Sequence, residues 1–222
     1  MMKIKALLLT IVVIFSCFSY VSCEKNREYD EAEVVLAAKD LIKKSEVLNE
    51  IYYGKGISYN DDKSAANGNY YPADTFHLTT FGIETVDDIK KLTYQCFSSG
   101  MSNSIISTKL TSISDDDGIK GFARYYQKYS AIDNTPECIM VYKDATVYLT
   151  DRIEYHYDNI TASHSKGEEV FVNVPVSVIT ADGKTQEQTL SVSLIEESDG
   201  WRINSPTYCK YVDRDYYEDL QK

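Results

Sequence analysis

Three histidines, His77, His156 and His164, are the side chains that first suggest acid–base or metal chemistry. Hydrolysis by a nucleophile needs a Ser or Cys beside a His that an acid orients. The chain contains no Gly-x-Ser-x-Gly nucleophile turn. We interpret His156, between Tyr155 and Tyr157, as an exposed strand residue, and His77 as a packing residue of a loop. The sequence therefore predicts no catalytic residue and no cofactor.

The acidic run Asp115-Asp116-Asp117-Gly118 suggests calcium, because hard cations prefer clustered carboxylates. The run does not fit the EF-hand loop, in which position 1 would be Ile113 and the Glu of position 12 would be Arg124. We interpret the aspartates as the acidic first turn of a helix. The sequence predicts no metal site here or among the histidines.

Tyrosine is the most unusual feature of the composition, with 19 copies. A tyrosine joins a large apolar ring to a polar tip, so it suits ligand pockets and protein interfaces, although core packing explains most of these positions. If a pocket exists, the candidate residues are Tyr126, Tyr155 and Trp201, with Tyr126 or Tyr155 as a hydrogen-bond donor. We expect such a pocket between the first long helix and the sheet.

Residues 1–22 have the three parts of a secretion signal: Lys3 and Lys5, an apolar run over 6–18, and small residues near the end. The stretch Tyr20-Val21-Ser22-Cys23 resembles the lipobox of bacterial lipoproteins, in which the Cys carries lipid. We therefore predict Cys23 as the lipid attachment point and 23–29 as a tether. The localisation that follows is extracytoplasmic and membrane-anchored, in the cell envelope.

Three alternatives to this anchor stay open. The uncharged stretch of 18 residues is at the lower limit for an uncleaved spanning helix. Cys17 is a rival lipidation site, and Cys23 could also be an ordinary secreted thiol.

The formal net charge of the chain is −11, and removal of Lys3 and Lys5 with the signal leaves 21 basic and 34 acidic residues, or −13. A protein that binds phosphate backbones needs a basic face, so nucleic acid is excluded as a partner. The expected partners are the membrane, through the lipid, and an envelope protein or a small ligand.

Three further cysteines, Cys96, Cys138 and Cys209, allow one disulfide at most and leave one free thiol. The absence of a Cys-x-x-Cys pair argues against a redox or zinc site.

Helical signals come first in the chain. Asp30 and Glu33 begin an amphipathic helix that ends at Gly54, and a second helix starts at Thr85 and runs to Gly100. We expect a long surface segment over 54–80. A third, weaker helix is predicted from a cap at Ser114 to Tyr126.

Alternating apolar residues follow from about residue 137. The valines of 169–180 share one face of a strand, and an Asp-Gly turn leads to a return strand over 187–197 whose Leu190, Val192 and Leu194 share that face. Pro175 predicts that the first of these strands lies at a sheet edge or carries a bulge. A second turn at Asp199-Gly200 leads into Trp201.

Helices followed by an antiparallel meander predict an α+β fold, with N-terminal helices packed on a curved antiparallel sheet. This order, together with Tyr53-Gly54-Lys55-Gly56 and the late stretch 200–208, resembles the NTF2-like (cystatin-like) superfamily and its uncharacterised exported lipoproteins. The resemblance implies an NTF2-like cone over 30–208, with 209–222 as a polar tail. It also implies a non-catalytic binding or interaction module. The alternative is an envelope enzyme with a small-molecule pocket.

Overall fold

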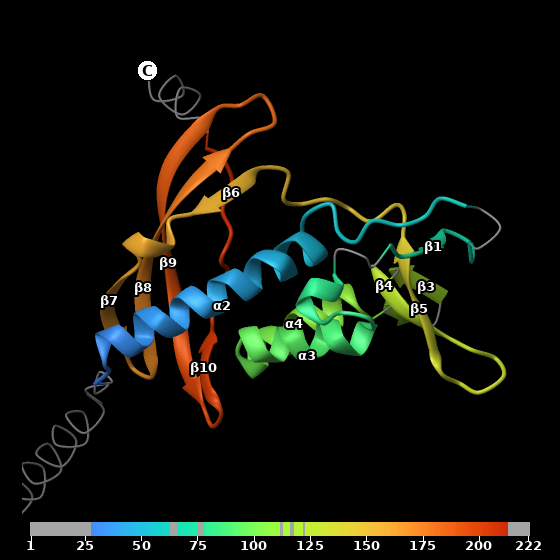
Figure 1. Cartoon of the computed structure of the whole chain (residues 1–222), viewed down its shortest axis with the longest axis horizontal. Coiled ribbons are helices and arrows are strands. Elements are labelled where there is room, and N and C mark those ends of the chain that lie inside the picture. The colour runs from blue at the N-terminus through green and yellow to red at the C-terminus, as the bar shows by residue number, and fades with distance from the viewer. Residues whose placement is uncertain are drawn as a thin grey trace, which may run out of the picture.

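The structure is a computed structural model that describes residues 28–62, 66–74, 78–111, 113–115, 118–121 and 123–212. It is an α+β fold with a curled antiparallel sheet, as the order of the sequence signals predicted (Figure 1). The elements in chain order are α2 (Glu31–Tyr52), β1 (Tyr70–Pro72), the 3-10 helix η2 (Thr79–Phe81), α3 (Val86–Cys96), α4 (Ser99–Lys109), β2 (Ile113–Asp115), β3 (Gly118–Gly121), β4 (Tyr125–Tyr129), β5 (Pro136–Tyr142), β6 (Arg152–Tyr155), the 3-10 helix η3 (Tyr157–Asn159), β7 (Thr161–Lys166), β8 (Glu169–Ile179), β9 (Thr185–Glu197) and β10 (Gly200–Ile203).

The long helix α2 begins where the sequence predicted. The Asp30 carboxylate accepts hydrogen bonds from the backbone N–H groups of Ala32 and Glu33, which caps the first turn. The Glu33 side chain makes no reciprocal cap, because its carboxylate instead accepts from Trp201 Nε1 at 2.9 Å. This contact fixes the start of α2 against β10.

The curved sheet is a meander in which β8 and β9 pair antiparallel along their whole length, from Glu169↔Ile195 to Ile179↔Thr185. The predicted hairpin is therefore confirmed. All five valines of its first strand are buried with no exposed surface, on the face that α2 covers (Figure 1). On the return strand Leu190 is only partly buried, and the buried partners are Val192 and Leu194.

Pro175 lies neither on an edge strand nor at a bulge of its own strand, so both predicted alternatives are wrong; the register shift in this part of the sheet lies on β7, between Ala162 and His164. β8 is central: it pairs with β9 on one side and with β6 and β7 on the other. The N–H that Pro175 lacks would face the β6–β7 side of β8. On that side the backbone N–H of His156 donates to the Pro175 carbonyl at 2.9 Å. There the neighbouring strand is interrupted by η3, so the proline lies opposite a break in the pairing.

The stretch from Ser114 to Tyr126 is not a helix, which corrects the third helical prediction. β2 and β3 form an antiparallel pair, and β4 joins β5 and β1 in a separate three-stranded sheet. Gly118 and Gly121 each weaken a helix by about 1 kcal/mol relative to Ala, whereas tyrosines favour strands. The third helix is instead α4, whose cap is the Ser98 hydroxyl, which accepts from Met101 N.

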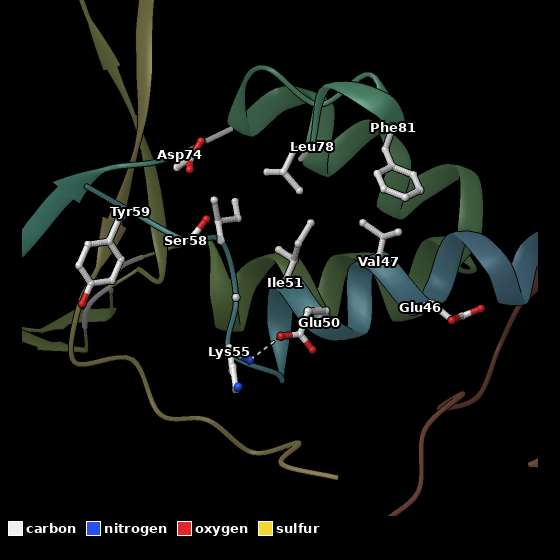
Figure 2. A pocket seen from close by; sticks show the side chains of 12 residues that line it. Glu46, Val47, Glu50, Ile51, Lys55, Ser58, Tyr59, Asp74, Leu78 and Phe81 are labelled. Atoms are coloured by element: carbon white, nitrogen blue, oxygen red, sulfur yellow. Dashed lines mark hydrogen bonds between the residues drawn. The ribbon is translucent and has the colours of Figure 1, made fainter. Parts of the chain in front are cut away.

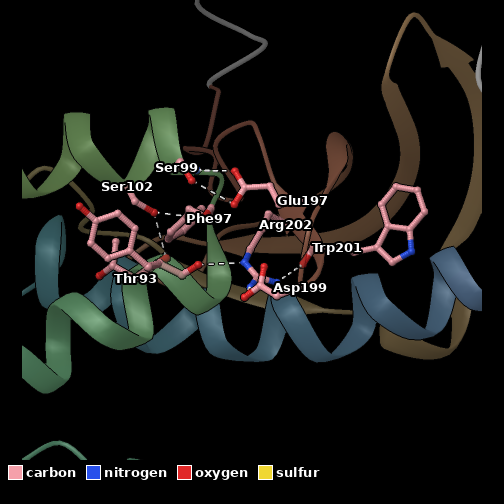
Figure 3. Close-up of polar contacts among 9 residues, drawn as sticks. Thr93, Phe97, Ser99, Ser102, Glu197, Asp199, Trp201 and Arg202 are labelled. Atoms are coloured by element: carbon pink, nitrogen blue, oxygen red, sulfur yellow. Dashed lines mark hydrogen bonds and ion pairs between the residues drawn. The ribbon is translucent and has the colours of Figure 1, made fainter.

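The β9–β10 turn is fixed to the junction between α3 and α4 by charged groups (Figure 3). Arg202, only 8% exposed, donates from Nε to the Tyr94 carbonyl at 2.9 Å and from Nη2 to Asp199 at 2.6 Å. On the same side, the Glu197 carboxylate accepts from Ser99 N at 2.8 Å. Since Arg202 is buried and paired, removal of Asp199 would leave an uncompensated cation.

Candidate functional site: an apolar cavity beside the long helix

A cavity of about 750 Å³ lies between the C-terminal half of α2 and the segment that carries η2 (Figure 2). Val47 and Ile51 of α2 face Leu78 and Phe81 across it, and Ile57 also lines it. Cavities of about 300–1,000 Å³ with mainly apolar walls are typical of small-molecule sites. Residues 75–77, which include His77, lie outside the described part of the chain.

The polar side chains that line this cavity are three carboxylates, one lysine and two hydroxyl groups, from Glu46, Glu50, Asp74, Lys55, Ser58 and Tyr59. Burial raises the pKa of Glu46, and nearby Lys43 opposes the shift. Glu50 accepts a hydrogen bond from the backbone N–H of Lys55 at 2.9 Å, which ties the end of α2 to the chain that leaves it. Asp74 borders the opposite side. The cavity is thus an apolar space with a negatively charged border.

Behind the cavity, Gly56 lets the chain turn closely around Arg124 and Tyr125. Gly56 has φ +82°, and a Cβ there would lie 2.4 Å from the Tyr125 hydroxyl and 2.5 Å from Arg124 Nη2. The Tyr125 hydroxyl donates to the Ile51 carbonyl at 2.7 Å, and Arg124 Nη2 donates to the Gly54 carbonyl at 2.7 Å. These contacts close the C-terminus of α2.

The structure does not gather the three predicted pocket residues. Tyr126 lies on β4, where its hydroxyl accepts from Asn67 Nδ2 at 2.9 Å. Tyr155 and Trp201 lie on the strands at opposite ends of the curved sheet, β6 and β10. The lining residues of the 750 Å³ cavity include none of the three.

Tyr155 does lie beside a carboxylate, in a smaller pocket of about 230 Å³ that Glu46 and Asp151 also line. Its hydroxyl donates to the Thr207 carbonyl at 2.7 Å, so its proton is already used in a hydrogen bond. Burial, and after it the charge of Glu46, raises the pKa of Tyr155 well above its usual range. Tyr155 therefore stays protonated and is held by the chain that follows β10.

The space between α2 and the curved sheet is filled by side chains. Val172, Val174 and Val176 of β8 are fully buried in one apolar cluster with Ala38 and Ile42 of α2. Among the described residues, the buried polar and charged side chains include no carboxylate. A ligand site inside the curve of the sheet would need these side chains to move.

His156, Ser177 and Glu187 are the residue types of a hydrolytic triad, but they are connected in a different order. Its Nε2 lies 2.7 Å from Ser177 Oγ, and Ser177 Oγ donates to Glu187 at 2.8 Å. A hydrolytic triad has the His between the nucleophile and the acid. Here His156 approaches both Ser177 and Glu187 Oε2, at 3.7 Å, with the same Nε2, so its two ring nitrogens do not link the serine to an acid.

The remaining predicted residues give little further chemistry. Cys96, Cys138 and Cys209 are free thiols, and burial raises the pKa of Cys96. Within the described ranges, no group of three His, Cys, Asp or Glu side chains could hold a metal ion, and no helix is long and apolar enough to cross a membrane. Cys23, Asp116 and Asp117 lie outside those ranges.

The sequence predicted a pocket between α2 and the sheet and did not predict the cavity between α2 and η2. Its lining residues Leu78 and Phe81 belong to η2 and the turn before it, where three-residue elements show no periodicity. The available signal was two large apolar residues within a loop-like stretch. Comparisons of the chain with protein-family models, with curated proteins and with solved structures gave no match in any of the three.

Proposed function

We propose that the mature chain is a lipid-anchored, extracytoplasmic binding module that holds an apolar ligand in the α2–η2 cavity. The observation that carries the proposal is the cavity of about 750 Å³, with Val47, Ile51, Leu78 and Phe81 turned toward one another across it. Phe81 is 53% exposed, so the apolar lining of the cavity reaches the surface of the molecule.

The NTF2-like assignment belongs to the same proposal. It is supported by the long helix α2 packed along one face of a strongly curved meander, in which β8 and β9 have 11 and 13 residues. The extracytoplasmic location and the lipid on Cys23 are supported by the sequence signals of residues 1–23.

Binding without catalysis is preferred because the NTF2-like enzymes place an acid and a donor inside the sheet, where this chain has valines. One observation favours the enzyme alternative: Glu46, whose pKa burial raises, borders both the large cavity and the Tyr155 pocket. A raised carboxyl pKa in a cleft is typical of general acids and bases.

The proposal is tested by filling the cavity. Val47→Trp adds bulk to a cavity residue, whereas Leu36→Trp adds bulk to α2 at a position that is 71% exposed. Titration with the uncharged apolar dye Nile red should show binding to the parent and to Leu36→Trp but not to Val47→Trp, with circular dichroism confirming that all three are folded. Equal binding by the two variants would place the dye elsewhere and refute the proposal.

A further inference from the structure

A second, smaller pocket lies on the far side of the α2 C-terminus, between the end of α4 and the chain that follows β5. Its volume is about 180 Å³, and its lining includes Lys109, Arg124, Tyr148 and Asp144. A pocket of this size is smaller than a whole-ligand site, so it fits a single chemical group. Two of its lining residues are cations, in a chain whose formal net charge is −11.

Arg124 is the deeper of the two cations, at 6% exposure. Its Nη1 donates to the Tyr52 carbonyl at 2.9 Å and its Nη2 to the Gly54 carbonyl at 2.7 Å, so these two nitrogens satisfy the end of α2. The third nitrogen, Nε, is buried and has no hydrogen-bond partner. A buried donor without a partner costs about 1–3 kcal/mol, more when it is charged.

Lys109 is the second cation, on the last residue of α4. Its Nζ lies over the rings of Tyr148, at 4.4 Å from the centroid, and Tyr53, at 5.1 Å. Burial lowers the pKa of Lys109, and the charge of Arg124 lowers it further. In the part of the chain that the structure describes, neither cation forms an ion pair with a carboxylate.

We propose that this pocket binds a small oxyanion, a phosphate or carboxylate group, between Lys109 and Arg124. Two cations in one partly enclosed pocket concentrate positive potential, and an anion would relieve their mutual repulsion. The carboxylate of Asp144, which also lines the pocket, forms no ion pair with either cation and would disfavour anions of high charge. The pocket shares no lining residue with the apolar cavity.

Acetylation of lysines by an N-hydroxysuccinimide ester, followed by mass spectrometry of the full-length chain, tests this site. Lys90, which pairs with Asp87 at 2.8 Å on the surface of α3, is the internal control. Inorganic phosphate at about ten times its Kd should slow Lys109 labelling about tenfold relative to chloride at equal ionic strength, because about one site in ten stays empty. Lys90 should react equally in both salts.

Parallel arms with acetate and with glycerol phosphate identify which oxyanions the pocket accepts, and protection by any of the three anions supports the site. Lys109→Gln, at a half-buried position, should remove the rise in melting temperature that the protecting anion gives the parent. The proposal is overturned if Lys109 reacts equally in chloride and in all three anions. It is also overturned if Lys90 is protected to the same degree.

Discussion

The close fit of Arg124 and Tyr125 against Gly56 leads to a quantitative prediction for Gly56→Ala. A Cβ at residue 56 meets the Tyr125 hydroxyl and Arg124 Nη2 at 2.4 and 2.5 Å, at a backbone φ of +82°. The left-handed backbone alone costs an Ala about 1–2 kcal/mol. Gly183 is a matched control, because its φ is +83° and a Cβ added there would have no other atom within 4 Å.

The difference between the two variants isolates the packing term. Displacing the Tyr125 hydroxyl loses two neutral hydrogen bonds, to the Ile51 carbonyl and from Ile57 N, each worth about 1 kcal/mol, and displacing Arg124 Nη2 loses one charged bond, worth about 1.5–3 kcal/mol. Gly56→Ala should therefore lower the free energy of unfolding by about 3–5 kcal/mol more than Gly183→Ala, measured by urea unfolding with equal m-values. Equal losses from the two substitutions would refute the rigid packing described here.

Three further predictions concern the core, the cavity border and the anchor. Val174→Asp places an unpaired carboxylate in a fully buried site, which costs several kcal/mol against a typical protein stability of about 5–15 kcal/mol. Circular dichroism should therefore show an unfolded chain, whereas an unchanged melting temperature would contradict the burial of Val174 in the core. Burial raises the pKa of Glu46 above its ordinary value of 4.5, so the native state loses stability as the pH rises from 4.5 through the raised pKa. In thermal melts, Glu46→Gln should therefore stabilise the protein at pH 7 and have no effect near pH 4. Cys23→Ser should abolish labelling by fatty acid and release the protein from membranes in a bacterial host, whereas label found on Cys17 would identify the rival site.

The elements that the sequence predicted well are those in which a periodic apolar pattern runs over many residues, or in which the helix start has a strong cap. Thr85 and Asp88 form the predicted capping box, with both reciprocal hydrogen bonds present. The β8–β9 hairpin is long enough for alternation to fix its register, and the Asp-Gly turn marks its centre. In these cases the local signal and the tertiary packing agree.

The elements that were missed depend on contacts distant in sequence. β1 has three residues and forms only because Tyr71 pairs with Val141 of β5. α4 has a serine-rich sequence, and its first turn is held by Glu197 of β9, which accepts a hydrogen bond from Ser99 N at 2.8 Å. The cavity depends on how η2 packs against α2, and the apolar pattern of the sequence does not predict that packing.

The most direct test of the central proposal is to locate a bound apolar molecule by NMR. With decanol as the probe, nuclear Overhauser contacts should connect its chain to the methyl groups of Val47, Ile51 and Leu78, and be absent from Val174 on β8. Contacts to the β8 valines would instead show that the interior of the curved sheet opens to accept the ligand. That result, or the absence of contacts to the cavity methyl groups at saturating probe, would contradict the account.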